Sequence, residues 1–200
     1  FVNSTPNLFE NQGYYNQGYG IYASNSVFRV LPKCLNGLCS DIDRNTFSNL
    51  NYGVYVLNYN SNSFKIDRAT FNDCWNGVFA TGATAQQIIR NNFNVKESAN
   101  TAAFGVRLYN STAYIVEENL FTNFDDPNVP LANSQAYGIV VSNSGTKANR
   151  IYKNSFKNLM IGGQSQLTNG ITITDEENNQ GDDPDCKGDP VCPPTMRGLV

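Results

Sequence analysis

Histidine is absent from this sequence, and only 16% of the residues are charged. Without histidine, the chain has neither the Ser–His nor the Cys–His pair of nucleophilic catalysis. Lys and Arg number 14 against 17 Asp and Glu, so the chain lacks the basic field that binds nucleic acids or acidic membranes. No apolar run is long enough for a membrane span, and no glycine-rich phosphate loop occurs. We therefore expect no nucleic-acid partner, no transmembrane segment and no cofactor.

The five cysteines form an odd set. Two pairs close short glycine-containing loops, Cys34 with Cys39 in "CLNGLC" and Cys186 with Cys192 in "CKGDPVC". No CxxC spacing exists, so zinc is a weak interpretation and we expect no metal site. Two local disulfides are the favoured interpretation, and they predict an oxidising, extracellular or cell-surface setting. Reduced thiols are the alternative, and Cys74 is predicted to be a small buried hydrophobe.

A short glycine-centred phrase recurs along the chain. "YGIYASNS" (Tyr19–Ser26) returns as "YGIVVSNS" (Tyr137–Ser144), with related copies at 52–58, 76–82 and 104–110. Its glycines are Gly20, Gly53, Gly77, Gly105 and Gly138, and we expect Gly170 to open one more copy. Apolar residues follow one and three positions after each glycine, an alternation typical of a half-buried strand.

A second phrase precedes each glycine phrase and is centred on a phenylalanine. These residues are Phe47, Phe71, Phe93, Phe121 and Phe156, at spacings of 24, 22, 28 and 35. Five positions earlier stand Ile42, Ile66, Ile88, Val116 and Ile151, and two positions earlier stand Asn45, Ala69, Asn91, Asn119 and Asn154. A period near 22 to 24 residues without a helical stretch indicates a solenoid. The leucine-rich repeat shares this period but needs an LxxLxL pattern that is missing here.

The combined pattern, I-x-x-N-x-F-x-N followed by G-V/I-x-V, resembles the coil of right-handed parallel β-helix proteins in the pectate-lyase-like superfamily. The resemblance covers residues 19–173 and implies an all-β fold, a right-handed parallel β-helix of about six coils. That superfamily includes lyases, hydrolases, epimerases, phage tailspikes and adhesins, so the fold does not fix a function. The Asn-rich style and short Cys loops are also similar to large surface proteins of Bacteroidota.

We expect three regions: a lead-in at 1–18, the β-helix at 19–174, and an acidic, Cys-looped cap or linker at 175–200. The chain starts at Phe1 without Met or a signal peptide, so further domains of the same chain are expected as partners. Two coils carry insertions, at 94–104 and 123–137, in the same place between the phenylalanine and glycine phrases. Loops from stacked coils at one position are expected to form a wall on one side.

The outward position two residues after each glycine is the best candidate for a binding site. It reads Tyr22, Tyr55, Phe79, Arg107, Val140 and Thr172. Aromatic rings stack on sugar faces, and a guanidinium binds a carboxylate or sulfate. We assign Tyr22, Tyr55, Phe79 and Arg107 as the predicted ligand-binding residues. The alternative is that stacked rings only stabilise neighbouring strands.

No residue is assigned a catalytic role. The charged residues before each phenylalanine, among them Asp43, Asp67 and Arg90, are predicted to pair structurally from coil to coil. "FDDP" carries adjacent carboxylates at Asp125 and Asp126, which in a loop before proline indicate a turn more than a catalytic pair.

Two functions remain open, and a third rests on resemblance alone. The first is a noncatalytic segment of a secreted or cell-surface bacterial β-helix protein, adhesin-like or glycan-binding, with a polysaccharide or a host or cell-surface glycan as partner. The second is a polysaccharide lyase or glycoside hydrolase with a cleft flanked by the inserted loops, in which Asp125 or Asp126 would face Arg107. The third makes the protein cargo of a bacterial secretion system, with its translocon as partner. We favour the first.

Overall fold

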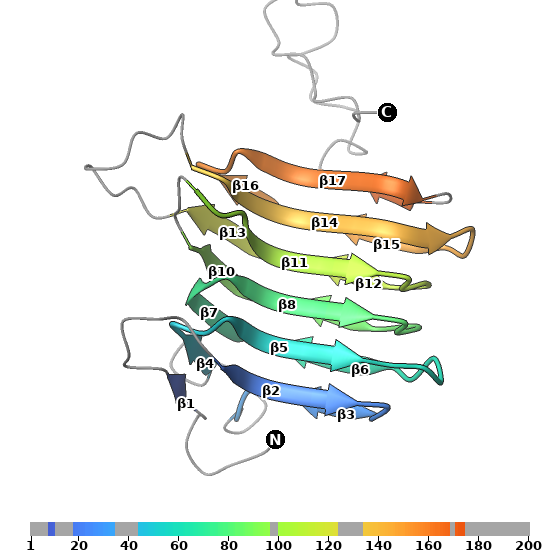
Figure 1. Ribbon diagram of the computed structural model, residues 1–200, viewed down its shortest axis with the longest axis horizontal. Coiled ribbons are helices and arrows are strands. Elements are labelled where there is room, and N and C mark those ends of the chain that lie inside the picture. Colours follow the sequence, from blue (N-terminus) through green and yellow to red (C-terminus); the bar gives the residue numbers. More distant parts are fainter. Residues whose placement is uncertain are drawn as a thin grey trace, which may run out of the picture.

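The described part of the protein consists of strands stacked in three parallel sheets (Figure 1). The structure is a computed structural model and describes residues 8–10, 18–34, 44–96, 100–123, 134–168 and 171–174. None of these segments forms a helix with the length and apolarity needed to span a bilayer.

Each sheet contains six strands, one from every coil. Sheet A contains β1 (Leu8–Glu10), β4 (Asn45–Ser48), β7 (Ala69–Cys74), β10 (Asn92–Val95), β13 (Leu120–Asn123) and β16 (Ser155–Lys157). Sheet B contains β2 (Tyr19–Ser24), β5 (Tyr52–Leu57), β8 (Asn76–Thr81), β11 (Ala103–Tyr109), β14 (Ala136–Gly145) and β17 (Ile161–Thr168). Sheet C contains β3 (Phe28–Val30), β6 (Phe64–Asp67), β9 (Gln87–Ile89), β12 (Ile115–Glu117), β15 (Asn149–Tyr152) and β18 (Ile171–Thr174).

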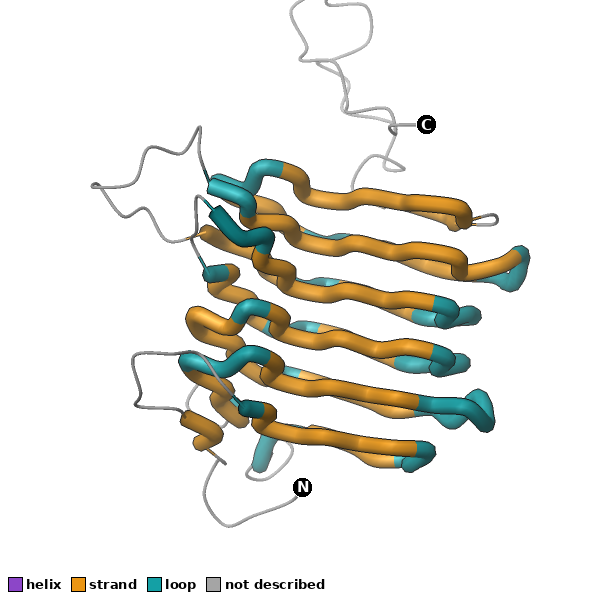
Figure 2. The backbone as a smooth tube through the Cα atoms, viewed as in Figure 1, coloured by secondary structure: helices purple, strands orange, loops and turns teal. Residues whose placement is uncertain are grey.

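The chain visits the sheets in the order A, B, C and then returns to A one step further along the stack (Figure 2). Every strand pair is parallel, and each strand pairs with the equivalent strand of the next coil. Connections between parallel strands of one sheet are right-handed in nearly all proteins. The fold is the right-handed parallel β-helix of six coils that the repeat predicts.

Apolar columns fill the interior, as the alternation after each glycine predicts. In sheet B the inward columns are Ile21, Val54, Val78, Val106, Ile139 and Ala23, Val56, Ala80, Leu108, Val141, all buried. In sheet C the inward column is Val30, Ile66, Ile88, Val116 and Ile151. Because each residue rests on its counterpart about 4.8 Å away, one phrase must recur in every coil.

Each glycine of the repeated phrase contacts the phenylalanine of the following coil. A Cβ atom built on Gly77 would lie 2.7 Å from Cδ1 of Phe93 and 2.6 Å from the carbonyl oxygen of Gly105. The same two kinds of contact occur at Gly20, Gly53, Gly105 and Gly138. The phenylalanine rings also stack on one another, with centroids 4.7 Å apart between Phe71 and Phe93. Only glycine leaves room for this packing, so the two phrases depend on each other.

Asparagine amides connect the coils at the turn that leads into sheet A. Oδ1 of Asn119 accepts hydrogen bonds from the backbone N–H of Asn91 at 2.8 Å and from its Nδ2 at 3.0 Å. Nδ2 of Asn119 donates to Oδ1 of Asn154 at 2.9 Å. At Ala69, which has no amide, the side-chain ladder ends with the Ala69 N–H donating to Oδ1 of Asn91 at 2.8 Å. These contacts confirm the predicted asparagine column.

The placement of the sixth glycine phrase at Gly170 was wrong. Ile171, Thr172 and Ile173 belong to β18 and pair with β15 in sheet C. The strand that continues sheet B is β17, where Gly163 pairs with Ile139. Gly163 stands one position after the repeat glycine, where the other copies have Ile or Val. The apolar alternation of β18 resembles that of a glycine phrase, which explains the wrong placement.

The first position of the isoleucine column also differs from the prediction. Val30 of β3 pairs with Ile66 and occupies that position, whereas Ile42 lies outside the described residues. β1 lies within the segment expected to be a lead-in and pairs with β4 in parallel.

Gly77→Ala is expected to lower the free energy of unfolding by about 3 kcal/mol or more, because the new methyl group overlaps both a fully packed ring and a backbone carbonyl. Gly163→Ala is the matched control, since a Cβ there meets nothing within 4 Å. Urea unfolding followed by circular dichroism measures both. Equal stability of the two variants would contradict the packing described above.

Candidate functional site

The predicted ligand-binding residues come together on the outer face of sheet B. Tyr22 pairs with Tyr55 and Tyr55 with Phe79, with ring centroids 5.4 and 5.1 Å apart. Arg107 pairs with Phe79 in the next coil. Tyr22 is 57% exposed and Arg107 is exposed, while Tyr55 and Phe79 are partly covered. The column therefore forms a continuous outward row across four coils.

A second aromatic column, which the sequence interpretation missed, runs beside the first. It consists of the residues that precede each glycine: Tyr19, Tyr52, Asn76, Phe104 and Tyr137. Tyr19 and Tyr52 stack at 5.3 Å, and Phe104 and Tyr137 at 5.2 Å. The sequence signal for this column is the Tyr or Phe that directly precedes most of the repeat glycines, in the "YG" and "FG" pairs.

Strict alternation hides the second column. Counted back from the inward Val54, alternation places Gly53 outside and Tyr52 inside. In β5, Gly53 and Val54 are both buried, and Tyr52 is partly exposed. The inward glycine beside the next coil's phenylalanine shifts the alternation by one residue, which turns Tyr52 and its counterparts outward.

The two columns have ring planes nearly perpendicular to each other. Rings within a column are parallel, with interplanar angles of 6° for Tyr19–Tyr52 and 6° for Tyr22–Tyr55. Between columns, Tyr52 and Tyr55 meet edge to face at 82° with centroids 4.9 Å apart. The ring faces of the two columns therefore point in different directions.

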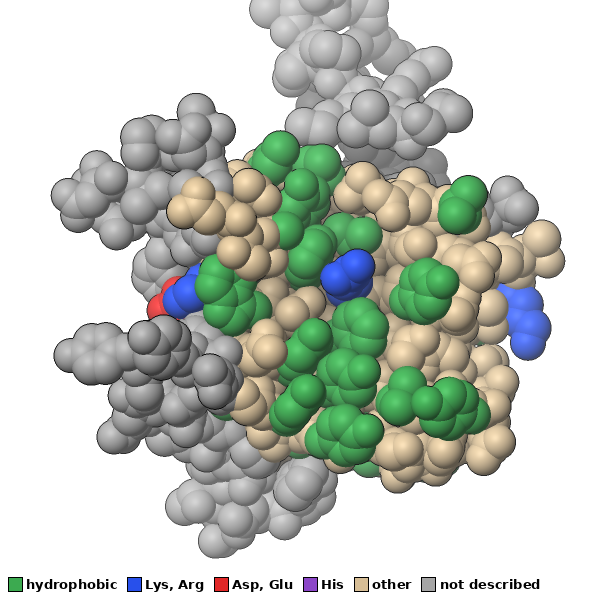
Figure 3. All heavy atoms as spheres, viewed as in Figure 1, with side chains coloured by type: hydrophobic (Ala, Val, Ile, Leu, Met, Phe, Trp, Pro, Cys, Tyr) green, Lys and Arg blue, Asp and Glu red, His purple; other side chains and the backbone are tan. Residues whose placement is uncertain are grey.

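Hydrophobic side chains gather in a band along the middle of this face, with one basic group among them (Figure 3). Arg107 is the single charged residue in the six strands of sheet B. Its guanidinium carbon lies 4.9 Å from the ring centroid of Phe104 and 5.9 Å from that of Phe79. Two cation–π contacts therefore hold the guanidinium between the aromatic groups.

The pKa of Tyr55 is raised above its ordinary value of 10.0. Burial is the largest cause, and the nearby hydroxyls of Tyr52, Tyr19 and Tyr22 add to it. Tyr55 therefore stays a neutral phenol at physiological pH. The band offers neutral rings and hydroxyl groups around one fixed positive charge.

The outer column changes character beyond Arg107. Val140 pairs with Arg107 and is only 5% exposed. The following position is Gln164 of β17, so the prediction of Thr172 at this position was wrong. The aromatic part of the predicted column thus ends at Phe79, and Phe104 and Tyr137 continue it in the neighbouring column.

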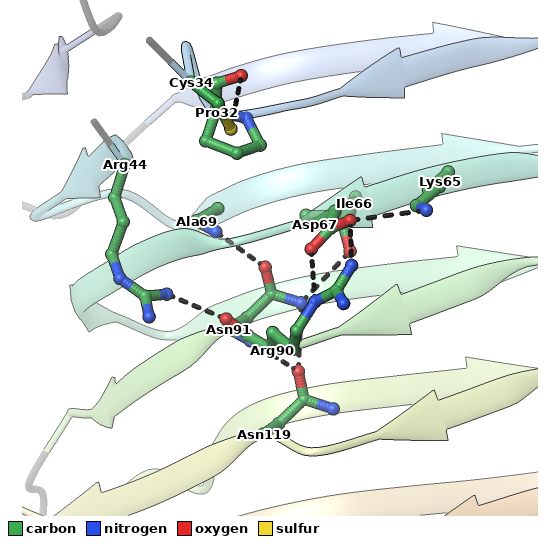
Figure 4. A network of polar contacts seen from close by, with 10 residues as sticks. All are labelled: Pro32, Cys34, Arg44, Lys65, Ile66, Asp67, Ala69, Arg90, Asn91 and Asn119. Atoms are coloured by element: carbon green, nitrogen blue, oxygen red, sulfur yellow. Dashed lines mark hydrogen bonds and ion pairs between the residues drawn. The ribbon is translucent and has the colours of Figure 1, made fainter. Parts of the chain in front are cut away.

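The charged column forms structural pairs at the turn before sheet A (Figure 4). Arg90 donates from Nε to Oδ1 of Asp67 at 2.9 Å and from Nη2 to Oδ2 at 2.5 Å, and Nζ of Lys65 lies 3.3 Å from Oδ2. Nη1 of Arg44 donates to the Arg90 carbonyl at 2.8 Å. Burial would raise the pKa of Asp67, but the hydrogen bonds and charge of Arg90, aided by Lys65, hold it below its ordinary value of 3.8. The Asp67 carboxylate, paired with Arg90 of the next coil and with Lys65, therefore has a structural role.

Several predicted residues lie outside the described residues. These are Asp43, Asp125, Asp126, Cys39, Cys186 and Cys192, so the turn expected at Asp125 and Asp126 and the disulfide pairings stay predictions. Cys34 is disulfide-bonded. Cys74 is free, and burial raises the pKa of its thiol to about 12, as expected for a small buried hydrophobe. Among the described residues, no three acidic, Cys or His side chains gather closely enough to hold a metal ion.

Asp67→Asn is expected to remove part of the acid sensitivity of the fold. A carboxyl whose folded pKa lies below 3.8 stabilises the protein above that pH and loses this contribution as the pH falls through the folded pKa. The stability difference between wild type and Asp67→Asn should therefore be greatest near neutral pH and shrink in acid. Urea midpoints over a pH series measure it, with Glu118→Gln, exposed at the corresponding turn two coils further along the stack, as the control. Parallel profiles for wild type and Asp67→Asn would rule out this role of Asp67.

Comparisons with known proteins bear on the fold. The sequence model of the right-handed β-helix region matches residues 1–182. Comparisons with curated proteins and with solved structures found no match. The matched range contains every described strand, from β1 to β18. Three parallel sheets, a glycine–phenylalanine repeat and this match agree, and the chain belongs to the right-handed β-helix family.

Proposed function

We propose that the protein is a noncatalytic, glycan-binding segment of a secreted or cell-surface protein, and that the outer face of sheet B is its binding surface. The aromatic band carries this proposal. Tyr19, Tyr22, Tyr52, Tyr55 and Phe79 form a two-column array in which every ring contacts another. An apolar array of this extent on an exposed sheet face indicates a contact surface.

The chemistry of the band favours a polysaccharide over a protein partner. Four of the five rings in the array are tyrosines, whose flat bodies pack on the C–H faces of sugars while their hydroxyls bond to sugar hydroxyls. The third outward column beside the band includes Ser24, Thr81 and Ser142, which add uncharged polar groups. The array extends across the strands along the helix axis, which suits a linear polymer.

The proposed extracellular or cell-surface location is supported by the disulfide. The disulfide at Cys34 is of a kind that persists in oxidising compartments, which supports an extracellular or cell-surface location. Further domains of the same chain and a secretion translocon stay predicted partners. The polysaccharide lyase or hydrolase alternative depends on Asp125 or Asp126, which lie outside the described residues.

The double variant Tyr55→Ala/Phe79→Ala is expected to weaken glycan binding roughly ten-fold or more, because it removes two ring contacts worth about 0.5–1.5 kcal/mol each. A glycan array with the purified chain identifies ligands, and titration calorimetry then compares the variants. Tyr59→Ala is the matched control, since Tyr59 is 74% exposed and follows the end of β5. Circular dichroism and thermal unfolding confirm that each variant is folded.

A wild-type chain that binds no glycan on the array would overturn the proposal. Equal affinity of a folded double variant and the wild type would move the binding site away from the aromatic band. Either result would leave the rings as strand-stabilising pairs or as a surface for a protein partner.

A further inference from the structure

The aromatic band has two parts, and Arg107 lies between them. On one side are Tyr55 and Phe79, in β5 and β8. On the other are Phe104, which shares β11 with Arg107, and Tyr137 in β14, and both belong to the neighbouring column. A linear ligand that crosses the strands would meet Tyr55 and Phe79, then Arg107 with Phe104 beside it on the same strand, and then Tyr137 in the neighbouring column.

The guanidinium of Arg107 is poised for an anion. Its contacts are the ring faces of Phe104 and Phe79, which position it without using its N–H donors. No carboxylate among the described residues forms an ion pair with it. A planar guanidinium presents paired donors that match a carboxylate or sulfate group.

The surrounding rings restrict where a negative charge can sit. The face of an aromatic ring carries negative electrostatic potential, so it attracts cations and repels anions. A polymer with a carboxylate on every sugar would place some of these groups over Tyr22, Tyr55 or Tyr137, whose rings Arg107, the single cation in the strands of sheet B, does not contact. Only an isolated acidic group at Arg107, with uncharged sugars before and after it, satisfies the whole band.

We propose that sheet B selects polysaccharides that carry an acidic group at intervals, with the acid bound by Arg107 and neutral sugars packed on the rings at either side. This inference rests on the proposed function and specifies its ligand class. Arg107 then determines specificity, and the tyrosines and phenylalanines supply affinity for the neutral sugars.

The test uses three polymers and titration calorimetry. They are a glucuronoxylan, in which glucuronate occurs at intervals on a neutral xylan; the same polymer after chemical reduction of its carboxyl groups; and polygalacturonate, with a carboxylate on every sugar. The wild type should bind native glucuronoxylan about ten-fold more tightly than the reduced form. It should bind polygalacturonate more weakly than either, and salt should weaken only the binding of the native polymer.

Arg107→Gln should lose the preference for native over reduced glucuronoxylan and keep the affinity for the reduced form. Arg107→Lys should retain part of the preference, since it keeps the charge without the planar donors. Tyr55→Ala/Phe79→Ala should lose affinity for both forms.

The two proposals fail differently. Equal wild-type binding of native and reduced glucuronoxylan, or tightest binding of polygalacturonate, overturns the specificity proposal while glycan binding stands. The specificity proposal is also overturned if the Arg107→Gln variant folds but loses affinity for the native and the reduced polymer equally. Arg107 would then support the surface without selecting an acid. Binding of none of the three polymers overturns the specificity proposal, and an array without any bound glycan overturns the proposed function.

Discussion

The packing of a phenylalanine ring on the glycine of the preceding coil is the contact on which this β-helix depends. A side chain at Gly53 would begin 2.5 Å from Phe71 and 2.6 Å from the Gly77 carbonyl, so the coils can approach only where this position is glycine. The inward glycine also shifts the strand's alternation and turns the preceding residue outward. The interior contact therefore determines which side chains reach the outer face of sheet B. An exposed aromatic array on that face is a consequence of how the core is built.

Much of the fold could be predicted because a stacked coil repeats its requirements in every copy. Phe71, Phe93 and Phe121 occupy one buried column at spacings that are visible in the sequence. The last coil escaped prediction because Gly163 stands where the other coils have a branched residue, while Ile171 and Ile173 in sheet C imitate the glycine phrase. Sheets B and C share the same apolar alternation, so periodicity alone cannot distinguish them.

Of the two aromatic columns of the candidate site, only one could be predicted from the alternation of the sequence. Tyr22, Tyr55 and Phe79 obey strict alternation and were placed outside from sequence, whereas Tyr19 and Tyr52 violate it through the shift at the glycine. The cation–π placement of Arg107 depends on Phe104, a member of the column that alternation hides. The pairing of Asp67 with Arg90 could be predicted from the stacking of charged columns in the sequence. The burial of Asp67 could not be predicted and is seen only in the structure. Surface chemistry on a solenoid is thus predictable column by column once the inward positions are correctly assigned.

A crystal structure of the chain with a bound acidic oligosaccharide would show whether the outer face of sheet B is the ligand-binding surface. We expect sugar rings against Tyr55, Phe79 and Phe104, with the ligand crossing strands β5, β8 and β11 and its acidic group on the guanidinium of Arg107. A ligand bound on another face, or a sheet B face that is covered by another part of the chain, would show that the aromatic band is not the binding surface.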